Sequence, residues 1–146
     1  MTPADIKDLV SSRIPIARTL GLVLDEVGRD RARLLLRHDP GLQSHTGTLH
    51  AGAQTTAAET AAIALGLAVL EHVEVTCQSK SVELRFRKPA RTDLWASAQL
   101  QPEAIDGLEA RLTAEGKVDL AILVELSDLA GERLSEGTVI VTLRRL

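Results

Sequence analysis

The segment His45–Gly66, HTGTLHAGAQTTAAETAAIALG, decides the fold of this chain. A polar loop with two histidines runs directly into a long stretch of small and aliphatic residues. A segment that is apolar on nearly every side predicts a helix buried over most of its surface. Between His50 and Glu71 the only charged side chain is Glu59. Burying an ionised carboxylate without a partner costs several kcal/mol, so Glu59 requires an explanation.

The position of Glu59 leaves three explanations open. No Lys or Arg lies within two helical turns of it, so a pairing cation has to come from elsewhere in the fold or from another subunit. Glu59 either lies at a solvated edge of the helix, pairs with an Arg across an interface, or acts as a general base or nucleophile.

The start of the helix is a second candidate feature. In GTLHAGA, residues His50, Ala51 and Gly52 stand where the polar loop becomes a helix N-terminus. Free backbone N–H groups and the positive end of the helix dipole favour a developing oxyanion there, and Gly52 permits close approach of a ligand. An ordinary capped helix start without any ligand has the same local pattern.

Composition limits the class of protein. A chain of 146 residues fits a single domain, residues 1–146, and its net charge of −3 argues against a nucleic-acid partner. Phe86 and Trp95 are the only aromatic residues, so stacking platforms for bases are missing. Cys77 is the single cysteine, which leaves no intrachain disulfide and no cysteine zinc cluster. Because the N-terminus also lacks the apolar region of a signal peptide, we expect a soluble cytoplasmic protein.

The stretch Ala51–Leu70 has about the 20 residues that a membrane-spanning helix requires. It is nevertheless rich in Ala, Thr and Gly, it contains Gln54 and Glu59, and no Lys/Arg pattern flanks it. We therefore expect a buried helix and no membrane partner.

Periodicity predicts the remaining elements. Thr2 and Pro3 begin an N-terminal helical segment that stops at Gly21. The apolar alternation changes phase between Cys77 and Val82, which predicts a bulge or break near Gln78–Ser81. One short amphipathic helix is expected at 102–116. The predicted strands are 22–27, 31–37, the segment 73–86, 93–100, 120–127 and 138–145. This order predicts an α+β fold, in which a mostly antiparallel sheet wraps around one long apolar helix.

The segment GTLHAGAQTTAAE resembles the signature of the hotdog-fold acyl-CoA thioesterases, in which an acidic residue follows the motif histidine by nine positions, here His50 to Glu59. SVELRFRKPA (Ser81–Ala90) and IPIARTLGLVLDEV resemble the neighbouring segments of that family. The resemblance covers almost the whole chain. It implies a hotdog fold, with a five- or six-stranded antiparallel sheet around the Ala51–Leu70 helix. It also implies a homodimer or homotetramer with active sites at the subunit interface, where the helix carboxylate of one subunit faces the histidine loop of the other.

The resemblance further implies roles for five catalytic residues. Glu59 would activate water or attack a thioester carbonyl directly. The Ala51 N–H would polarise that carbonyl, with Gly52 shaping the turn and His50 orienting the loop. Ser79 matches a position at which some relatives carry a hydroxyl that helps to place the water.

Two departures from the family pattern affect the loop. Many relatives carry Asn six residues before the motif histidine, where this chain has Ser44. The first glycine after that histidine is Ala51, although a backbone donor survives this change. With His45 and Gly47 of the same loop, Ser44 is expected to contact substrate.

Coenzyme A would enter as part of the substrate, with no other cofactor and no metal. Its phosphates need local cations even on an acidic protein. The segment RFRKPAR supplies Arg85, Arg87, Lys88 and Arg91. Arg85 and Arg87 are equally well explained as the solvated face of a strand, so Lys88 and Arg91 are the preferred phosphate contacts.

Three functions remain open. The first is an acyl-CoA thioesterase. The second is a hotdog dehydratase or hydratase of 3-hydroxyacyl thioesters, in which His45 acts with Glu59 at a spacing of fourteen residues. The third is a non-catalytic protein that binds acyl thioesters. We expect His38 and His72 to be solvated and Cys77 to be a core residue.

Overall fold

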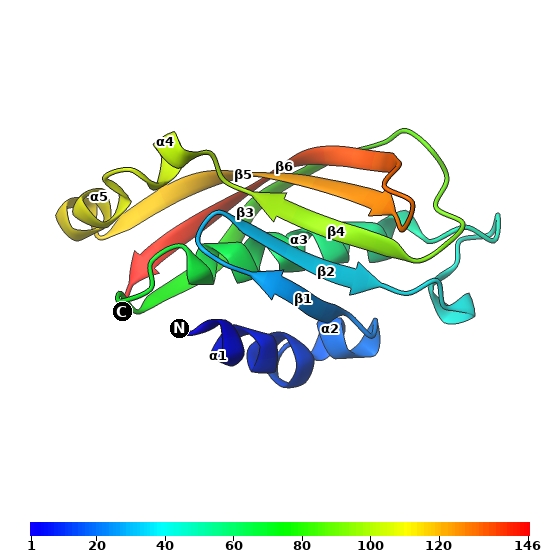
Figure 1. Ribbon diagram of the computed structural model, residues 1–146, viewed down its shortest axis with the longest axis horizontal. Helices are drawn as coiled ribbons and strands as arrows, with labels where there is room; N and C mark the ends of the chain where they lie inside the picture. The colour runs from blue at the N-terminus through cyan, green and yellow to red at the C-terminus, as the bar shows by residue number, and fades with distance from the viewer.

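The computed structural model describes residues 1–146 and shows one antiparallel sheet wrapped around a long helix (Figure 1). The helix α3 (Ala51–Ala68) lies against one face of the sheet. The six strands follow the order β1-β2-β4-β5-β6-β3. Their bounds are Val23–Val27 for β1, Arg31–Leu36 for β2, Val75–Phe86 for β3, Leu94–Gln99 for β4, Lys117–Asp128 for β5 and Arg133–Arg145 for β6. The predicted α+β fold is confirmed.

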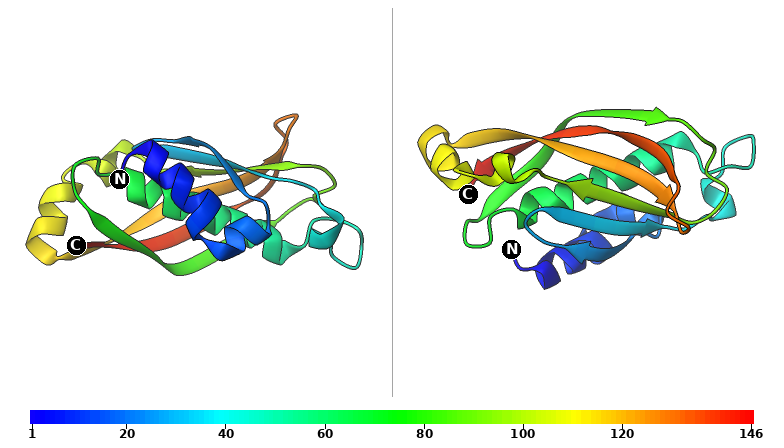
Figure 2. Two further views of the ribbon diagram at one scale, coloured as in Figure 1. Left: turned by 90° about the horizontal axis from the view of Figure 1, so that it is seen from below. Right: turned by 45° about the horizontal axis from the view of Figure 1, so that its top comes forward.

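The N-terminal helices cover the side of α3 that the sheet leaves open (Figure 2). Helix α1 (Pro3–Asp8) begins at Thr2, whose hydroxyl accepts from the Asp5 N–H while the Asp5 carboxylate accepts from the Thr2 N–H. A π-helical turn, η1 (Leu9–Arg13), connects it to α2 (Pro15–Thr19). The helical segment ends at Gly21, where φ is +66°, as the sequence predicted.

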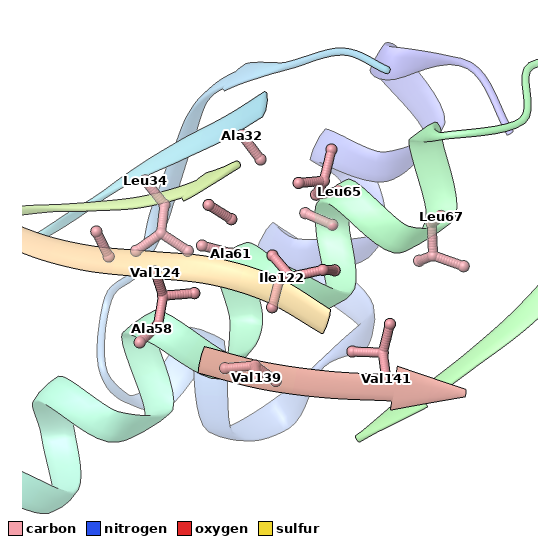
Figure 3. Close-up of a cluster of buried hydrophobic side chains, with 14 of the residues drawn as sticks. Ala32, Leu34, Ala58, Ala61, Leu65, Leu67, Ile122, Val124, Val139 and Val141 are labelled. Carbon is pink, nitrogen blue, oxygen red and sulfur yellow. The ribbon is translucent and has the colours of Figure 1, made fainter. Parts of the chain in front are cut away.

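The core lies between α3 and the inner face of the sheet (Figure 3). Small side chains such as Ala58 and Ala61 let the helix backbone approach the strands, and both are fully buried. Leu65 of α3 and Ile122 of β5 fill the space between them. No helix combines the length and the mean hydropathy that crossing a lipid bilayer demands.

Strand β3 contains the predicted bulge. It pairs with β6 in two registers, with Ser79 opposite Val141 and Ser81 opposite Ile140, so Lys80 is the extra residue. Before the bulge odd-numbered residues face the helix, and after it even-numbered residues do. The change of apolar alternation between Cys77 and Val82 therefore reflects a shift of register within one continuous strand.

The prediction of a single helix at 102–116 was wrong. The segment forms two helices, α4 (Pro102–Ile105) and α5 (Leu108–Glu115). Gly107 separates them with a φ of +67°, which ends one helix and redirects the chain into the next. Leu108 and Leu112 are buried as expected. The last two strands are also longer than predicted, because pairing continues to both ends of the β5–β6 hairpin.

Candidate active site

Glu59 meets a hydroxyl from the edge strand. It lies on α3, is partly buried, and accepts a short hydrogen bond from the Ser79 hydroxyl of β3 through its Oε1 atom. No Lys, Arg or His approaches its carboxylate closely enough for an ion pair. The partner of Glu59 within this chain is therefore a neutral donor, the Ser79 hydroxyl.

The bulge in β3 makes this contact geometrically possible. Ser79 is the last residue before the register shift, so its side chain points to the inner face and reaches α3. Lys80 points to the outer face, where its Nζ lies 2.6 Å from Oδ2 of Asp119. The side chains of the consecutive residues Ser79 and Lys80 therefore lie on opposite faces of the sheet.

At the start of α3 the backbone N–H groups of Ala51 and Ala53 have no partner in the chain, and Ala53 is buried. His50 caps the helix, and its Nδ1 accepts from the Gly52 N–H at 2.8 Å. The Ala51 N–H has no partner among the hydrogen bonds of the turns and caps. Both Ala51 and Gly52 are exposed. Of the donors expected here, Ala51 is the one open to a ligand, while Gly52 is engaged by the imidazole that orients the turn.

The preceding loop is held by hydroxyl groups. Oγ of Ser44 lies 2.8 Å from Oγ1 of Thr46 and 3.3 Å from Oγ1 of Thr48. Gly47 adopts a φ of +78°, which a side chain would disfavour. Ser44 thus organises the loop through its hydroxyl group. His45 is exposed and makes no hydrogen bond to Glu59 within the chain.

A buried amide that sequence reasoning did not select supports the same loop. Gln54 is 4% exposed, its Nε2 donates to the Leu49 carbonyl at 3.0 Å, and its Oε1 accepts from the Ser135 hydroxyl. These two hydrogen bonds connect Leu49, the residue directly before His50, to Gln54 of α3 and through it to Ser135 of β6. The sequence signal that could have identified Gln54 is a polar residue four positions after the helix cap His50.

The structure places the cations of RFRKPAR at the end of β3 far from Ser79. Lys88 pairs with Glu132, and this hydrogen bond and charge hold the pKa of the Lys88 ammonium above its usual value. Arg87 pairs with Glu136, whereas Arg91 is exposed and forms no ion pair. Lys88 is thus paired with a carboxylate of its own chain.

The expectation that both remaining histidines are solvated was wrong for His38. His72 is solvated, with its side chain 93% exposed. His38 is partly buried instead, because its backbone N–H donates to Asp93 at 2.8 Å and holds the residue against the start of β4. Its Nε2 is buried without a hydrogen-bond partner.

A curved antiparallel sheet around one central helix, with a carboxylate on that helix and a histidine at its cap, defines a hotdog-fold protein of the thioesterase superfamily. The chain belongs to the family described as "Domain of unknown function (DUF4442)", which it matches over residues 3–143. No curated protein sequence matches it significantly.

Three solved structures show the same fold. A protein of unknown function from Pseudomonas aeruginosa, described as a "Probable Thioesterase", is 28% identical with a TM-score of 0.86, over 100% of this chain and 97% of its own. A thioesterase family protein from Silicibacter pomeroyi is 21% identical with a TM-score of 0.74, over 99% and 98%. A mutant thioesterase from Pseudomonas aeruginosa is 15% identical with a TM-score of 0.77, over 100% and 96%.

Proposed function

We propose that this protein is an acyl-CoA thioesterase that hydrolyses the thioester with Glu59. The observation that carries the proposal is the hydrogen bond from Ser79 to Glu59, a carboxylate with no cation beside it on an otherwise apolar helix. A carboxylate held by a neutral donor at a partly buried position is suited to accept a proton from water. The similarity to thioesterase structures, at 28% identity in the first case, supports the same reaction class.

In the proposed reaction Glu59 removes a proton from water as the water oxygen attacks the thioester carbonyl carbon. Ser79 holds the carboxylate in place and orients the water. The tetrahedral intermediate carries its negative charge on the former carbonyl oxygen, where a backbone N–H such as that of Ala51 stabilises it. The carbon–sulfur bond then breaks, and the thiolate takes the proton that Glu59 received. Direct attack by the carboxylate, through an anhydride that water cleaves, gives the same products.

One protomer cannot supply both groups to a single carbonyl. Ala51 and Glu59 are eight positions apart on α3, which corresponds to about 12 Å along a helix axis. A carbonyl in contact with Glu59 is therefore out of reach of the Ala51 N–H of the same chain. We infer that a second copy contributes its Ala51 N–H, so that the active site forms between two subunits.

The edge of the sheet supports this homodimer. After the bulge, Val82 and Phe86 of β3 face the helix side of the sheet and remain 38% and 45% exposed. A free edge strand with exposed apolar side chains favours pairing with another strand. Pairing of two copies along residues 81–86 would cover these side chains and bring each helix start toward the other subunit's Glu59.

The first experiment measures thiol release from a panel of acyl-CoA esters, with wild type beside Glu59→Gln and Ser79→Ala. We expect Glu59→Gln to lower kcat/KM by about 10²–10⁴-fold, because general-base catalysis contributes on that order. Ser79→Ala should lower it by about tenfold, the loss of one orienting hydrogen bond. Glu59 is partly exposed, so both variants should unfold at nearly the wild-type temperature.

The same panel separates the competing functions. Undiminished hydrolysis by folded Glu59→Gln would contradict the role of this carboxylate. Turnover of 3-hydroxyacyl or enoyl thioesters that depends on His45 would indicate a dehydratase. Binding of acyl-CoA esters without turnover of any of them would leave a binding protein.

A further inference from the structure

A cationic cavity lies on the outer face of the sheet, close to the bulge. Its volume is about 560 Å³, and it lies between α5, the bulged part of β3, the start of β5 and the end of β6. Four cationic side chains line it (Lys80, Arg111, Lys117 and Arg144), together with two acidic ones (Glu115 and Asp119). On a chain with a net charge of −3, this excess of positive charge is local.

Two of these cations are placed directly opposite each other. Lys117 of β5 and Arg144 of β6 are cross-strand partners, so their side chains extend from the same face of the sheet. Their neighbours Val118 and Leu143 are buried on the inner face, which fixes both cations on the outer one. Neither cation forms an ion pair within the chain. Like charges opposite each other destabilise a sheet, and an anion between them would remove that cost.

The acidic residues of the cavity form no ion pair with Lys117 or Arg144. Asp119 accepts from Lys80 at 2.6 Å and from the Thr142 hydroxyl at 2.7 Å, and these hydrogen bonds hold the pKa of its carboxyl below the usual value. Asp119 is therefore engaged with Lys80, although the positive charge of Lys117 also helps to lower the pKa of the Asp119 carboxyl. Glu115 lies at the end of α5 and forms no ion pair with either cation.

The cavity adjoins the residue that holds Glu59. Ser79 lines it, and the Ser79 hydroxyl donates to Glu59 on the opposite face of the sheet. The bulge at Lys80 interrupts regular pairing between β3 and β6 at this position, and β3 has no partner strand on its other side. An elongated ligand can therefore pass over the edge of the sheet here, with one end at Glu59 and the other in the cationic cavity.

We propose that the Lys117–Arg144 cavity binds the phosphate groups of coenzyme A, whose pantetheine arm leads over the edge beside Ser79 to the thioester at Glu59. This inference rests on the proposed function. It assigns the phosphates to the unpaired cations of β5 and β6, in place of Lys88, which Glu132 already neutralises. It also identifies the carrier, because coenzyme A has a 3′-phosphate and a diphosphate, whereas a carrier protein presents one phosphodiester.

A purely structural role for these cations makes the opposite prediction about stability. Lys117 follows the C-terminus of α5, where a cation is favoured by the helix dipole. If that were its purpose, neutralising the pair would lower the unfolding temperature of the free protein. If the pair awaits an anion, neutralising it removes a repulsion and leaves the unfolding temperature unchanged or raised by about a degree.

The test compares the full chain carrying Lys117→Gln and Arg144→Gln with wild type. The probes are coenzyme A and adenosine 3′,5′-bisphosphate, with binding measured by isothermal titration calorimetry at low and at physiological ionic strength. We expect Kd for both probes to rise about tenfold or more, and its dependence on salt to weaken. A matched control, Lys7→Gln with Arg13→Gln on the N-terminal helices, removes the same charge from exposed positions and should leave Kd unchanged.

Several results would overturn the inference. An unchanged Kd in the Lys117/Arg144 variant would do so, as would a fall in unfolding temperature larger than that of the control. Equal affinity for inorganic phosphate and for the bisphosphate would show an unselective anion site instead of a nucleotide site.

The outcome is separable from that of the proposed function. An acyl group on N-acetylcysteamine carries no phosphate, so its hydrolysis should be equal in wild type and variant while KM for the coenzyme A ester rises. If wild type hydrolyses no ester but coenzyme A binding still depends on Lys117 and Arg144, the thioesterase proposal fails and the cavity assignment stands. If hydrolysis is robust and KM for the coenzyme A ester is unchanged in the variant, the reverse holds.

Discussion

The two halves of β3 lie on the same edge of the sheet but have different surroundings. The half before the bulge, Val75–Ser79, faces α3, where Cys77 packs against Gly66 and Ser79 meets Glu59. The half after it, residues 81–86, carries exposed apolar side chains on the same inner face. The first half packs against α3, whereas Val82 and Phe86 of the second half stay partly exposed. Strand β3 thus runs from the hydrophobic core to the surface at which we expect a second copy to bind.

The largest effect is expected where β6 supports the exposed half. A Cβ at Gly137 would lie 1.8 Å from the Glu83 carbonyl oxygen of β3, and a backbone atom cannot move aside without separating the strands. Gly137→Ala should therefore lower the free energy of unfolding by more than about 3 kcal/mol, at the upper end of overpacking effects. Urea unfolding followed by circular dichroism measures this loss.

A matched glycine serves as the control for that variant. A Cβ at Gly28, in the β1–β2 turn, meets nothing within 4 Å, and its φ lies outside the left-handed region. Gly28→Ala should be neutral, or stabilising by about 0.4–1 kcal/mol through the unfolded state. If both variants unfold alike, the close approach of β6 to β3 is not what Gly137 provides.

The next effect is expected in the half that α3 covers. A Cβ at Gly66 would lie 2.5 Å from the Cys77 sulfur. Overpacking of this kind costs about 1–3 kcal/mol, and the better helix propensity of Ala returns about 1 kcal/mol. We expect Gly66→Ala to destabilise the protein by up to about 2 kcal/mol. Adding Cys77→Ala should recover part of that loss, and a double-mutant cycle without coupling between the two sites would contradict the contact.

The sequence predicted those features of β3 that are local. The change of apolar phase between Cys77 and Val82 indicated the bulge, because side chains alternate with a period of two and one extra residue inverts the faces. The loop and helix from His45 to Gly66 were predicted for the same reason, since capping and burial depend on neighbouring residues. Glu59 was selected as the only charged side chain between His50 and Glu71, and its spacing from His50 was selected through the resemblance to the hotdog thioesterase signature.

What the sequence could not predict depends on contacts between distant segments. Lys117 and Arg144 become neighbours only through the register of β5 and β6, so neither stood out as a cation. The break at Gly107 was hidden because Ile105, Leu108 and Leu112 fit one continuous helical face, while the backbone turns left-handed between them. The burial of His38 likewise depends on Asp93, which is distant in sequence and precedes the strand paired with β2.

A substitution of Phe86 tests whether the exposed half of β3 pairs with a second copy. Phe86 is 45% exposed in the single chain, so Phe86→Ser should change the stability of the protomer little. In a dimer paired along residues 81–86 the ring would be covered, and its loss should weaken self-association by about tenfold. Sedimentation equilibrium over a range of protein concentrations measures this change. Unaltered association in the variant would place the subunit interface elsewhere.

The smallest expected effect is a pH dependence of stability that arises from Cys77, in the half of β3 that α3 covers. Burial, with the negative charge of Glu59, raises the pKa of the Cys77 thiol to about 12. Because the unfolded thiol loses its proton at lower pH than the folded one, stability falls as pH rises from about 9 toward 12, and the thiol adds no pH dependence below that window. At pH 10 the loss relative to Cys77→Ala should reach about 1 kcal/mol. The chain has no Tyr, which removes one competing titration from this range. The free energy of unfolding of wild type and of Cys77→Ala is therefore compared between about pH 8 and 11. If both depend on pH in the same way, the thiol is solvated and α3 does not cover this half of the strand.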